Sequence, residues 1–314
     1  MKSLPRYRDL PEFPEMDARH AWGVFGSDDQ LGRINLITDE TTQSGAAQVR
    51  RGARFNLSLP LNHPEPGWSQ TRKTYKHTIF SANRNSQDDY LDSFYMQRST
   101  QWDGLRHIRA REFGFWGGRQ DEHAGPGGPD LGIEQWVNHG IATRGVLIDV
   151  AGHQAAIGRP FHAGDPVAIT VEMLQAALDW EKATLQPGDV LMLRTGYTDA
   201  YLGADQAGRE ALAATRASAG LHAGHAMAEF LWDSGVAAIA ADNPAVEVVP
   251  VDPGVGSIHR RLIPLLGFCL GEFFSYGELA EDCRNDGRYT CFFVGVPLNV
   301  PGAVGSPGNA IAIK

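Results

Sequence analysis

The chain has only three cysteines, Cys269, Cys283 and Cys291, all near its C-terminal end. So few thiols cannot form a disulfide framework, and none shows the paired short spacing of a zinc knuckle. The sequence also lacks an uncharged apolar run of about 18 residues, the minimum for a membrane-spanning helix. Residues 1–15 contain three prolines and lack the apolar region of a signal peptide. These absences predict a cytoplasmic protein with no membrane association.

Positive charge is also scarce. The 28 Lys and Arg residues are outnumbered by 37 Asp and Glu residues, which gives a net charge of −9. This is the wrong sign for a phosphate-binding surface, so nucleic acid is not an expected partner. Hydrophobic residues make up 42% and charged residues 21% of the 314 positions, which is typical of a globular protein with a sizeable core.

Two common catalytic motifs are missing. The glycine-rich stretches 114–118 and 124–128 neither follow a strong strand pattern nor open a helix, so neither resembles a dinucleotide or phosphate loop. No serine lies between glycines at the spacing of a nucleophile elbow. The sequence therefore disfavours nucleotide-dependent enzymes and serine hydrolases.

Short apolar runs bounded by turn residues predict buried strands at 145–150, 189–194, 236–241 and 291–296. Helical spacing of apolar residues predicts helices over 171–185, with Thr170 as N-cap, and over 221–234. This alternation indicates an α/β fold, but the glycine-rich stretch 295–308 argues against a simple doubly wound sheet. We expect an N-terminal arm over residues 1–25 and one domain over 26–314.

Two groups of residues could carry chemistry. Asp103 and His107 are four apart, so on a helix they would share one face and could hold a cation. An ordinary solvated ion pair would look the same. His259 precedes Glu272 by thirteen residues, and Glu272 follows an apolar run whose end could face a cleft. Taken singly, residues of these types are more often structural than catalytic.

The segment around Asp103 resembles the signature HxGTHxDxxxH of the cyclase family of metal-dependent hydrolases, which includes kynurenine formamidase and isatin hydrolase. Here the stretch 97–107 reads QRSTQWDGLRH, with glutamine in place of two histidines and Ser99 in place of the glycine. Further stretches that resemble the family, in the same order, are 29–38, 144–149, 187–196, 242–247 and 305–312. The version with Gln-Trp-Asp-Gly resembles a longer branch of the family.

The resemblance implies a swivelling β/β/α fold: a mixed sheet partly closed into a barrel, with helices packed outside. It also implies a metal site made of Asp103, His107, His259 and Glu272. Gln97 and Gln101 stand where the family has two more histidines, and amide oxygens are poorer zinc ligands than imidazoles. We therefore expect at most one divalent ion, Zn or Mn, per chain.

The implied activity is hydrolysis of an amide, formamide or lactone in a small cyclic or aromatic substrate by water that the metal activates. His107 or Glu272 could act as general base, and Gln97 and Gln101 could donate hydrogen bonds to the substrate carbonyl or the oxyanion. Trp102 and Trp116 could stack on a planar substrate or belong to the core. The family also implies a homodimer or homotetramer. The alternative is a metal-free binding protein or a non-hydrolytic cyclase on the same scaffold, and Gln97 and Gln101 are its best support.

Overall fold

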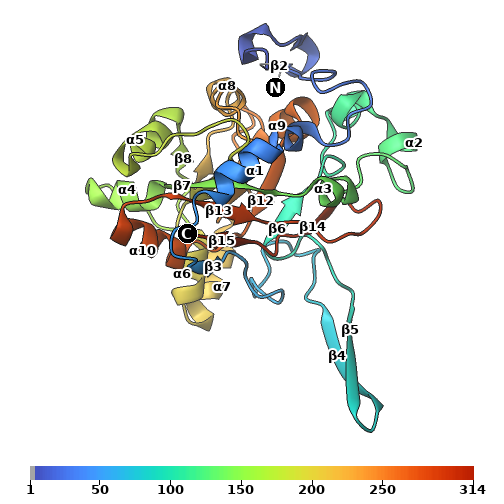
Figure 1. Ribbon diagram of the computed structural model, residues 1–314, viewed down its shortest axis with the longest axis vertical. Coiled ribbons are helices and arrows are strands. Elements are labelled where there is room, and N and C mark those ends of the chain that lie inside the picture. Colours follow the sequence, from blue (N-terminus) through green and yellow to red (C-terminus); the bar gives the residue numbers. More distant parts are fainter. Residues whose placement is uncertain (1–3) are drawn as a thin grey trace.

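A nine-stranded mixed sheet forms the centre of the computed structural model, which describes residues 4–314 (Figure 1). The strand order is β14-β6-β12-β11-β9-β7-β13-β15-β3. The strands of this sheet are β3 (Arg54–Asn56), β6 (Gln101–Asp103), β7 (Ala142–Asp149), β9 (Val190–Arg194), β11 (Ala238–Ala241), β12 (Cys269–Glu272), β13 (Thr290–Val294), β14 (Gly305–Pro307) and β15 (Ile311–Ile313).

The centre of the sheet is parallel and both of its sides are antiparallel. Strands β12, β11, β9 and β7 run parallel to one another, whereas β6 and β14 on one side and β13, β15 and β3 on the other pair antiparallel. Strands β7, β9, β11 and β13 confirm the four predicted apolar runs. Nearly every residue of β7, β9 and β11 is buried, as continuous apolar strands predict.

The sheet is strongly curled. Strand β14 lies at one edge, and β15 is next to the last strand at the other edge, yet only residues 308–310 connect them. Three residues span about 10 Å when extended, which is far less than the width of a flat sheet of this size. The two sides must therefore approach each other, which confirms the predicted partial closure into a barrel.

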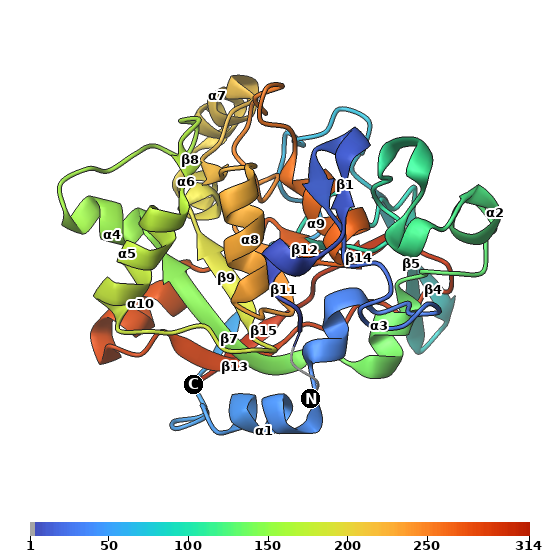
Figure 2. The same cartoon turned by 90° about the horizontal axis from the view of Figure 1, so that it is seen from above.

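Helices α4 (Val150–Ala156), α5 (Val171–Glu181), α8 (His225–Asp233) and α9 (Ile258–Leu266) form a row along the sheet, each packed against the next (Figure 2). Thr170 caps α5 as predicted, since its side chain accepts a hydrogen bond from the Met173 N–H. Helix α8 begins later than predicted because Leu221 belongs to a short strand, β10 (Gly220–Leu221). Helix α1 (Asp39–Ala46) packs against β7 and β13.

The remaining elements are short or lie outside the sheet. They are β1 (Glu12–Phe13), β2 (Ala18–Arg19), β8 (Ala168–Ile169), α2 (Asp121–Ala124), α3 (Glu134–His139), α6 (Tyr197–Gly203), α7 (Gln206–Thr215), α10 (Gly277–Asp286) and 3-10 turns at Tyr7–Asp9, Pro14–Met16, Gly32–Leu36, Arg111–Phe113 and Trp116–Gly118. Within residues 4–314, no helix combines the length and apolarity needed to cross a membrane.

The described part of the N-terminal arm, residues 4–25, packs on helices α8 and α9 of its own chain. Tyr7 and Leu10 are buried, and the Tyr7 backbone N–H donates to Asp233 Oδ1 at 2.8 Å. Residues 1–3 of the predicted arm lie outside the described part. The arm therefore covers part of the surface of helices α8 and α9.

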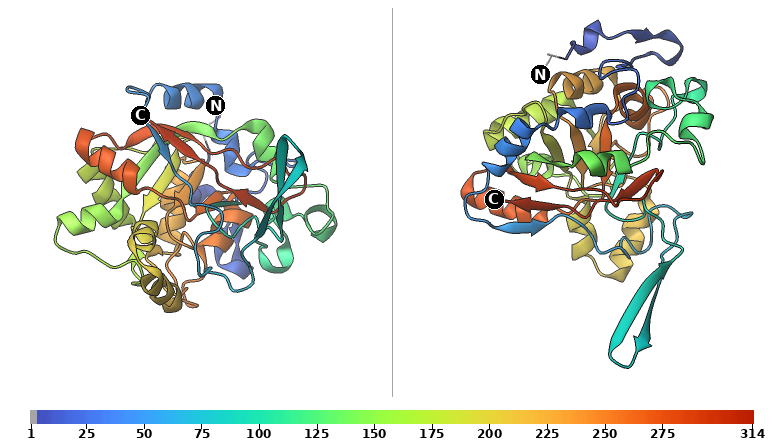
Figure 3. Two further views of the ribbon diagram at one scale, coloured as in Figure 1. Left: turned by 90° about the horizontal axis from the view of Figure 1, so that it is seen from below. Right: turned by 45° about the vertical axis from the view of Figure 1, so that its right-hand side comes forward.

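A long hairpin, which the sequence did not predict, extends from the body. Strands β4 (Lys76–Asn83) and β5 (Ser86–Asp92) pair antiparallel and project away from the other elements (Figures 1 and 3).

Candidate metal centre

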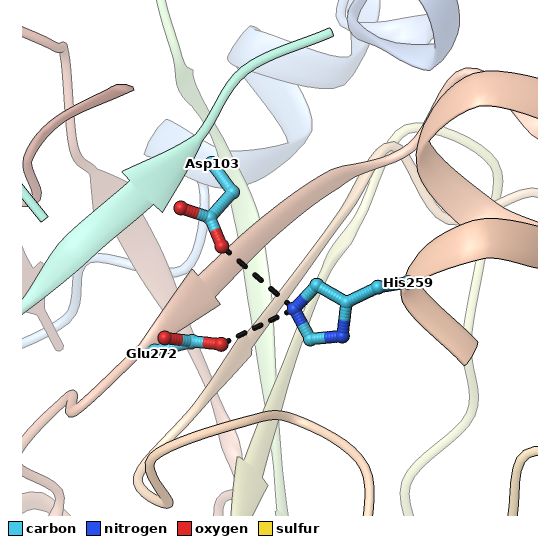
Figure 4. A group of neighbouring side chains, drawn as sticks. All are labelled: Asp103, His259 and Glu272. Atoms are coloured by element: carbon cyan, nitrogen blue, oxygen red, sulfur yellow. Dashed lines mark hydrogen bonds and ion pairs between the residues drawn. The ribbon is translucent and has the colours of Figure 1, made fainter. Parts of the chain in front are cut away.

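The centre is built where β6, β12 and the first turn of α9 meet. Strands β6 and β12 pair antiparallel, with Gln101 opposite Glu272. Because strand side chains alternate between faces, Gln101 and Asp103 lie on the same face, next to Glu272. Helix α9 places His259 over this face, so Asp103, His259 and Glu272 point toward one another (Figure 4).

These three side chains form a compact group of potential metal ligands. One ligand atom from each lies within 4.8 Å of the other two. His259 Nε2 is 3.2 Å from Glu272 Oε1 and 3.7 Å from Asp103 Oδ2. One imidazole nitrogen and two carboxylate oxygens form a donor set that suits Zn or Mn.

Gln101 binds the far side of both carboxylates, and Gln97 binds that of Asp103. The Gln101 amide donates to Glu272 Oε2 at 2.7 Å and to Asp103 Oδ1 at 3.2 Å, and the Gln97 amide also donates to Asp103 Oδ1. The second oxygen of each carboxylate is thereby left facing His259. Among the described residues, the buried Asp103 Oδ2 has no hydrogen-bond donor. A buried, unsatisfied carboxylate oxygen is costly unless a cation compensates it, so the residues present fit a metal ion.

His107 lies beside this group but is not part of it. Its Nε2 is 3.8 Å from Asp103 Oδ2, and its Nδ1 is 3.2 Å from the Gln97 amide nitrogen. Asp103 and His107 do not lie on a common helix. Strand β6 ends at Asp103, and a turn closed by the bond from His107 N–H to Gly104 C=O brings the imidazole back.

Glu247 also belongs to the site. The sequence did not single out this residue, although it is the last residue of the family-like stretch 242–247. Its Oε1 lies 2.9 Å from His259 Nδ1, and its carboxylate also accepts bonds from Ser257 Oγ and the Ile258 N–H. A carboxylate behind a histidine fixes the ring orientation and increases the basicity of the opposite nitrogen.

A second residue that the sequence analysis missed is Arg72, in the segment before β4. Its guanidinium donates to the Gln97 carbonyl. Burial and the charge of His259 lower the pKa of the His107 imidazole, and the Arg72 charge adds a smaller contribution in the same direction. No motif of the sequence pointed to this arginine.

Burial and mutual charge shift the pKa values of the centre. Burial, followed by the Asp103 charge, raises the pKa of Glu272 to about 7. Burial lowers the pKa of His107, although Asp103 partly opposes this shift. For His259, burial alone would lower the pKa, but the nearby carboxylates of Asp103, Glu247 and Glu272 raise it well above the usual value. Burial would raise the pKa of Asp103, but His107 and His259 keep it below its ordinary value.

The two tryptophans proposed for substrate stacking lie in the core. Trp102 points to the opposite face of β6 from its neighbours Gln101 and Asp103, is fully buried, and donates its indole N–H to Gly295 C=O at 2.8 Å. Trp116 is 1% exposed and donates to Asp29 Oδ2 at 2.8 Å. Neither ring has a face free for a substrate, so the structure gives both a packing role.

The chain is similar to proteins of known structure and to one family model. A family model described as "Putative cyclase" matches residues 55–248. A solved structure described as a novel cyclase is 34% identical, with a TM-score of 0.81 over 94% of this chain and 99% of the other. A search of curated proteins gave no match.

Two more distant structures share the fold. Isatin hydrolase A from Labrenzia aggregata, bound to benzyl benzoate, is 13% identical with a TM-score of 0.57, covering 87% of this chain and 97% of its own. A protein described as a predicted metal-dependent hydrolase from Bacillus stearothermophilus is 15% identical with a TM-score of 0.51, covering 84% of this chain and 98% of its own. Because the family model covers more than half of the sequence, this chain belongs to the cyclase family.

Proposed function

We propose that the protein is a metal-dependent hydrolase that opens or cleaves an amide, formamide or lactone of a small cyclic or aromatic substrate. The observation that carries this proposal is the buried group of Asp103, His259 and Glu272, in which Asp103 Oδ2 lacks a donor among residues 4–314. Three protein ligands leave a position open for water or substrate, as in catalytic metal sites.

Asp103, His259 and Glu272 would hold one divalent ion, Zn or Mn. The chemistry that such an ion supplies is a lower pKa for water and polarisation of a carbonyl oxygen. Both glutamine amides point their N–H groups at carboxylates rather than at a substrate. Their role here is to orient the ligands, in place of the oxyanion contact expected from the sequence.

His107 is the group best placed to take the proton from water. It lies outside the ligand group, and its lowered pKa keeps the imidazole neutral near pH 7, so that it can accept a proton. Glu272 is less suited to this role because both of its oxygens already have partners, His259 and Gln101.

The substrate class rests on the shared fold. Isatin hydrolase, whose name identifies the cyclic amide isatin as its substrate, has the same architecture at low sequence identity. Fold alone does not fix a substrate, so isatin, N-formyl aromatic amines and small lactones form the first panel to test.

The test combines metal content with turnover. Purified wild-type protein should contain about one equivalent of Zn or Mn and hydrolyse a member of the panel. The double variant Asp103→Ala/His259→Ala should lose both. His107→Gln should keep the metal and lower kcat roughly 10²–10⁴-fold, as expected for loss of a general base.

The alternative is a metal-free binding protein or non-hydrolytic cyclase, and one observation favours it. The raised pKa of His259 means that a protonated imidazole could compensate Asp103 and Glu272 without a metal. Absence of metal after incubation with Zn and Mn, together with no turnover, would reject the hydrolase in favour of this alternative.

A further inference from the structure

An arginine with no acidic partner lies beside the metal centre. Arg72 Nη1 donates to the Gln97 carbonyl, and the Gln97 side chain in turn contacts Asp103 and His107. Within residues 4–314, no carboxylate lies within ion-pair distance of this guanidinium, although the chain has a net charge of −9. A single charged group at the side of a reaction centre is typical of the groups that orient a small ligand.

A second arginine, Arg98, fixes the segment that carries Arg72. Arg98 is 6% exposed, and its guanidinium donates to Pro64 C=O at 2.7 Å and to Thr74 Oγ1 at 2.6 Å, on either side of Arg72 in the sequence. It also forms an ion pair with Glu65. The charge of Arg98 is thus paired, whereas Arg72 is held in place with its charge unpaired.

The free edge of Arg72 has the shape that a carboxylate needs. With Nη1 bound to Gln97, the Nε and Nη2 groups have no partner in the described part of the chain, and the side chain is half-buried. These two N–H groups are parallel and can donate to both oxygens of one carboxylate. Such a bidentate contact selects a carboxylate over a neutral carboxamide, which offers a single acceptor oxygen and no charge.

The Arg72 charge also acts on two residues of the centre. Burial and the charge of His259 lower the pKa of His107, and Arg72 adds to this effect. At Glu272, burial and the Asp103 charge raise the pKa to about 7, and Arg72 opposes them. A divalent ion would balance the charges of Asp103 and Glu272, so Arg72 would remain as a positive charge available to a substrate.

We propose that Arg72 is a specificity-determining residue that binds a carboxylate of the substrate. The substrates are then amides, formamides or lactones that carry a carboxylate near the bond that is broken, an inference that rests on the proposed function. The carboxylate lies on the Nε–Nη2 edge of Arg72 while the carbonyl to be attacked lies at the metal centre. A neutral substrate lacks this contact and binds more weakly.

The first test measures binding rather than turnover, by calorimetry of the purified protein with benzoate and benzamide. Benzoate should bind roughly 10–100-fold more tightly, as expected for charge-assisted hydrogen bonds. Arg72→Met should abolish this difference, and Arg72→Lys should keep part of it, because the charge remains but the planar edge is lost. Both variants should stay folded, since Arg98 holds the segment. Arg84→Met is the matched control, because it removes the same charge from the turn between β4 and β5.

The second test compares turnover of 3-formamidobenzoate and 3-formamidobenzamide, which share the same scissile formamide. The wild-type protein should prefer the acid roughly 10–100-fold in kcat/KM, mainly through a lower KM. Arg72→Met should remove this preference, and Arg84→Met should retain it. The ratio cancels any effect of the Arg72 variant on Gln97 that both substrates share.

Equal binding of benzoate and benzamide, or a preference for benzoate that Arg72→Met retains, would overturn the proposal. Inorganic phosphate that binds as tightly as benzoate would overturn the assignment to a carboxylate. Failure of the proposed function is distinguishable from these outcomes. Turnover of both formamides with equal kcat/KM would support the hydrolase and overturn Arg72 as its specificity-determining residue. Binding of benzoate that depends on Arg72, in a protein with neither metal nor turnover, would support the carboxylate site and reject the hydrolase.

Discussion

Glu247 Oε1 lies 2.9 Å from His259 Nδ1, and this contact holds His259 Nε2 toward Asp103 and Glu272. The two residues come from different parts of the chain: Glu247 follows β11, and His259 lies in the first turn of α9. The Glu247 carboxylate also accepts the Ile258 N–H at the start of that helix. One carboxylate thus fixes both the helix position and the imidazole orientation, with Nε2 facing the other two carboxylates.

Replacing the carboxylate behind His259 should weaken metal binding. In Glu247→Gln we expect a 10–100-fold loss of affinity for Zn or Mn, the usual effect of removing such a partner, measured by competition with a chelator. Glu181→Gln is the control. Glu181 is also a buried carboxyl, and burial raises its pKa to about 9, so an amide replaces a neutral acid there. Equal affinities in Glu247→Gln and wild type would contradict the assigned role.

Restoring histidine at the two glutamine positions should create a second metal site. Both amides now donate to Asp103 Oδ1. In Gln97→His/Gln101→His, two imidazoles would face that oxygen and could share it with a second ion. Elemental analysis should give about two equivalents of metal per chain, against one for wild type and at most one for Gln97→Ala/Gln101→Ala. A double-histidine variant with a single equivalent would show that the backbone geometry does not permit the second site.

Metal affinity should increase with pH. Binding requires His259 without its Nε2 proton and Glu272 as carboxylate, and both have raised pKa values in the metal-free protein, that of Glu272 about 7. Protons therefore compete with the metal below neutral pH and are released on binding. Calorimetry in buffers of different ionisation enthalpy should detect this release, and affinity should increase as the pH rises through about 7. Affinity that stays constant from pH 6 to pH 8 would contradict the raised pKa values.

Trp102 should matter for stability rather than for substrate binding. Trp102→Ala removes a fully buried ring that packs on Phe274 and an indole hydrogen bond to Gly295, so we expect a loss of about 3–5 kcal/mol in the free energy of unfolding. Trp180→Ala is the control. Trp180 is 39% exposed on α5, and its removal should cost clearly less. Chemical denaturation measures both, and similar losses would count against the packing role.

The sequence predicted several of the central strands and helices because local patterns are sufficient to recognise these elements. The apolar runs of β7, β9, β11 and β13 need no information from elsewhere to be recognised as buried strands. The N-cap at Thr170 depends only on the residues that follow it. The family resemblance also pointed to Asp103, His259 and Glu272, which the fold brings together.

Other features of the site depended on longer-range contacts. Asp103 and His107 are four residues apart, a spacing that suggested one helix face, but pairing with β12 makes residues 101–103 a strand. That pairing places Gln101 and Asp103 on the site face and turns Trp102 into the core. If the segment were a helix, Trp102 would not point to the face opposite Gln101 and Asp103.

The sequence by itself determined the family, the order along the chain of the central strands and helices, and the residue types of the candidate metal centre. These features follow from local patterns and a linear motif. Only the tertiary structure decided which oxygens face His259, that Glu247 lies behind it, and that Gln97 and Gln101 bind carboxylates. It also revealed the unsupported β4–β5 hairpin. These features depend on strand register and on the approach of segments that are distant in sequence, and no local pattern encodes either.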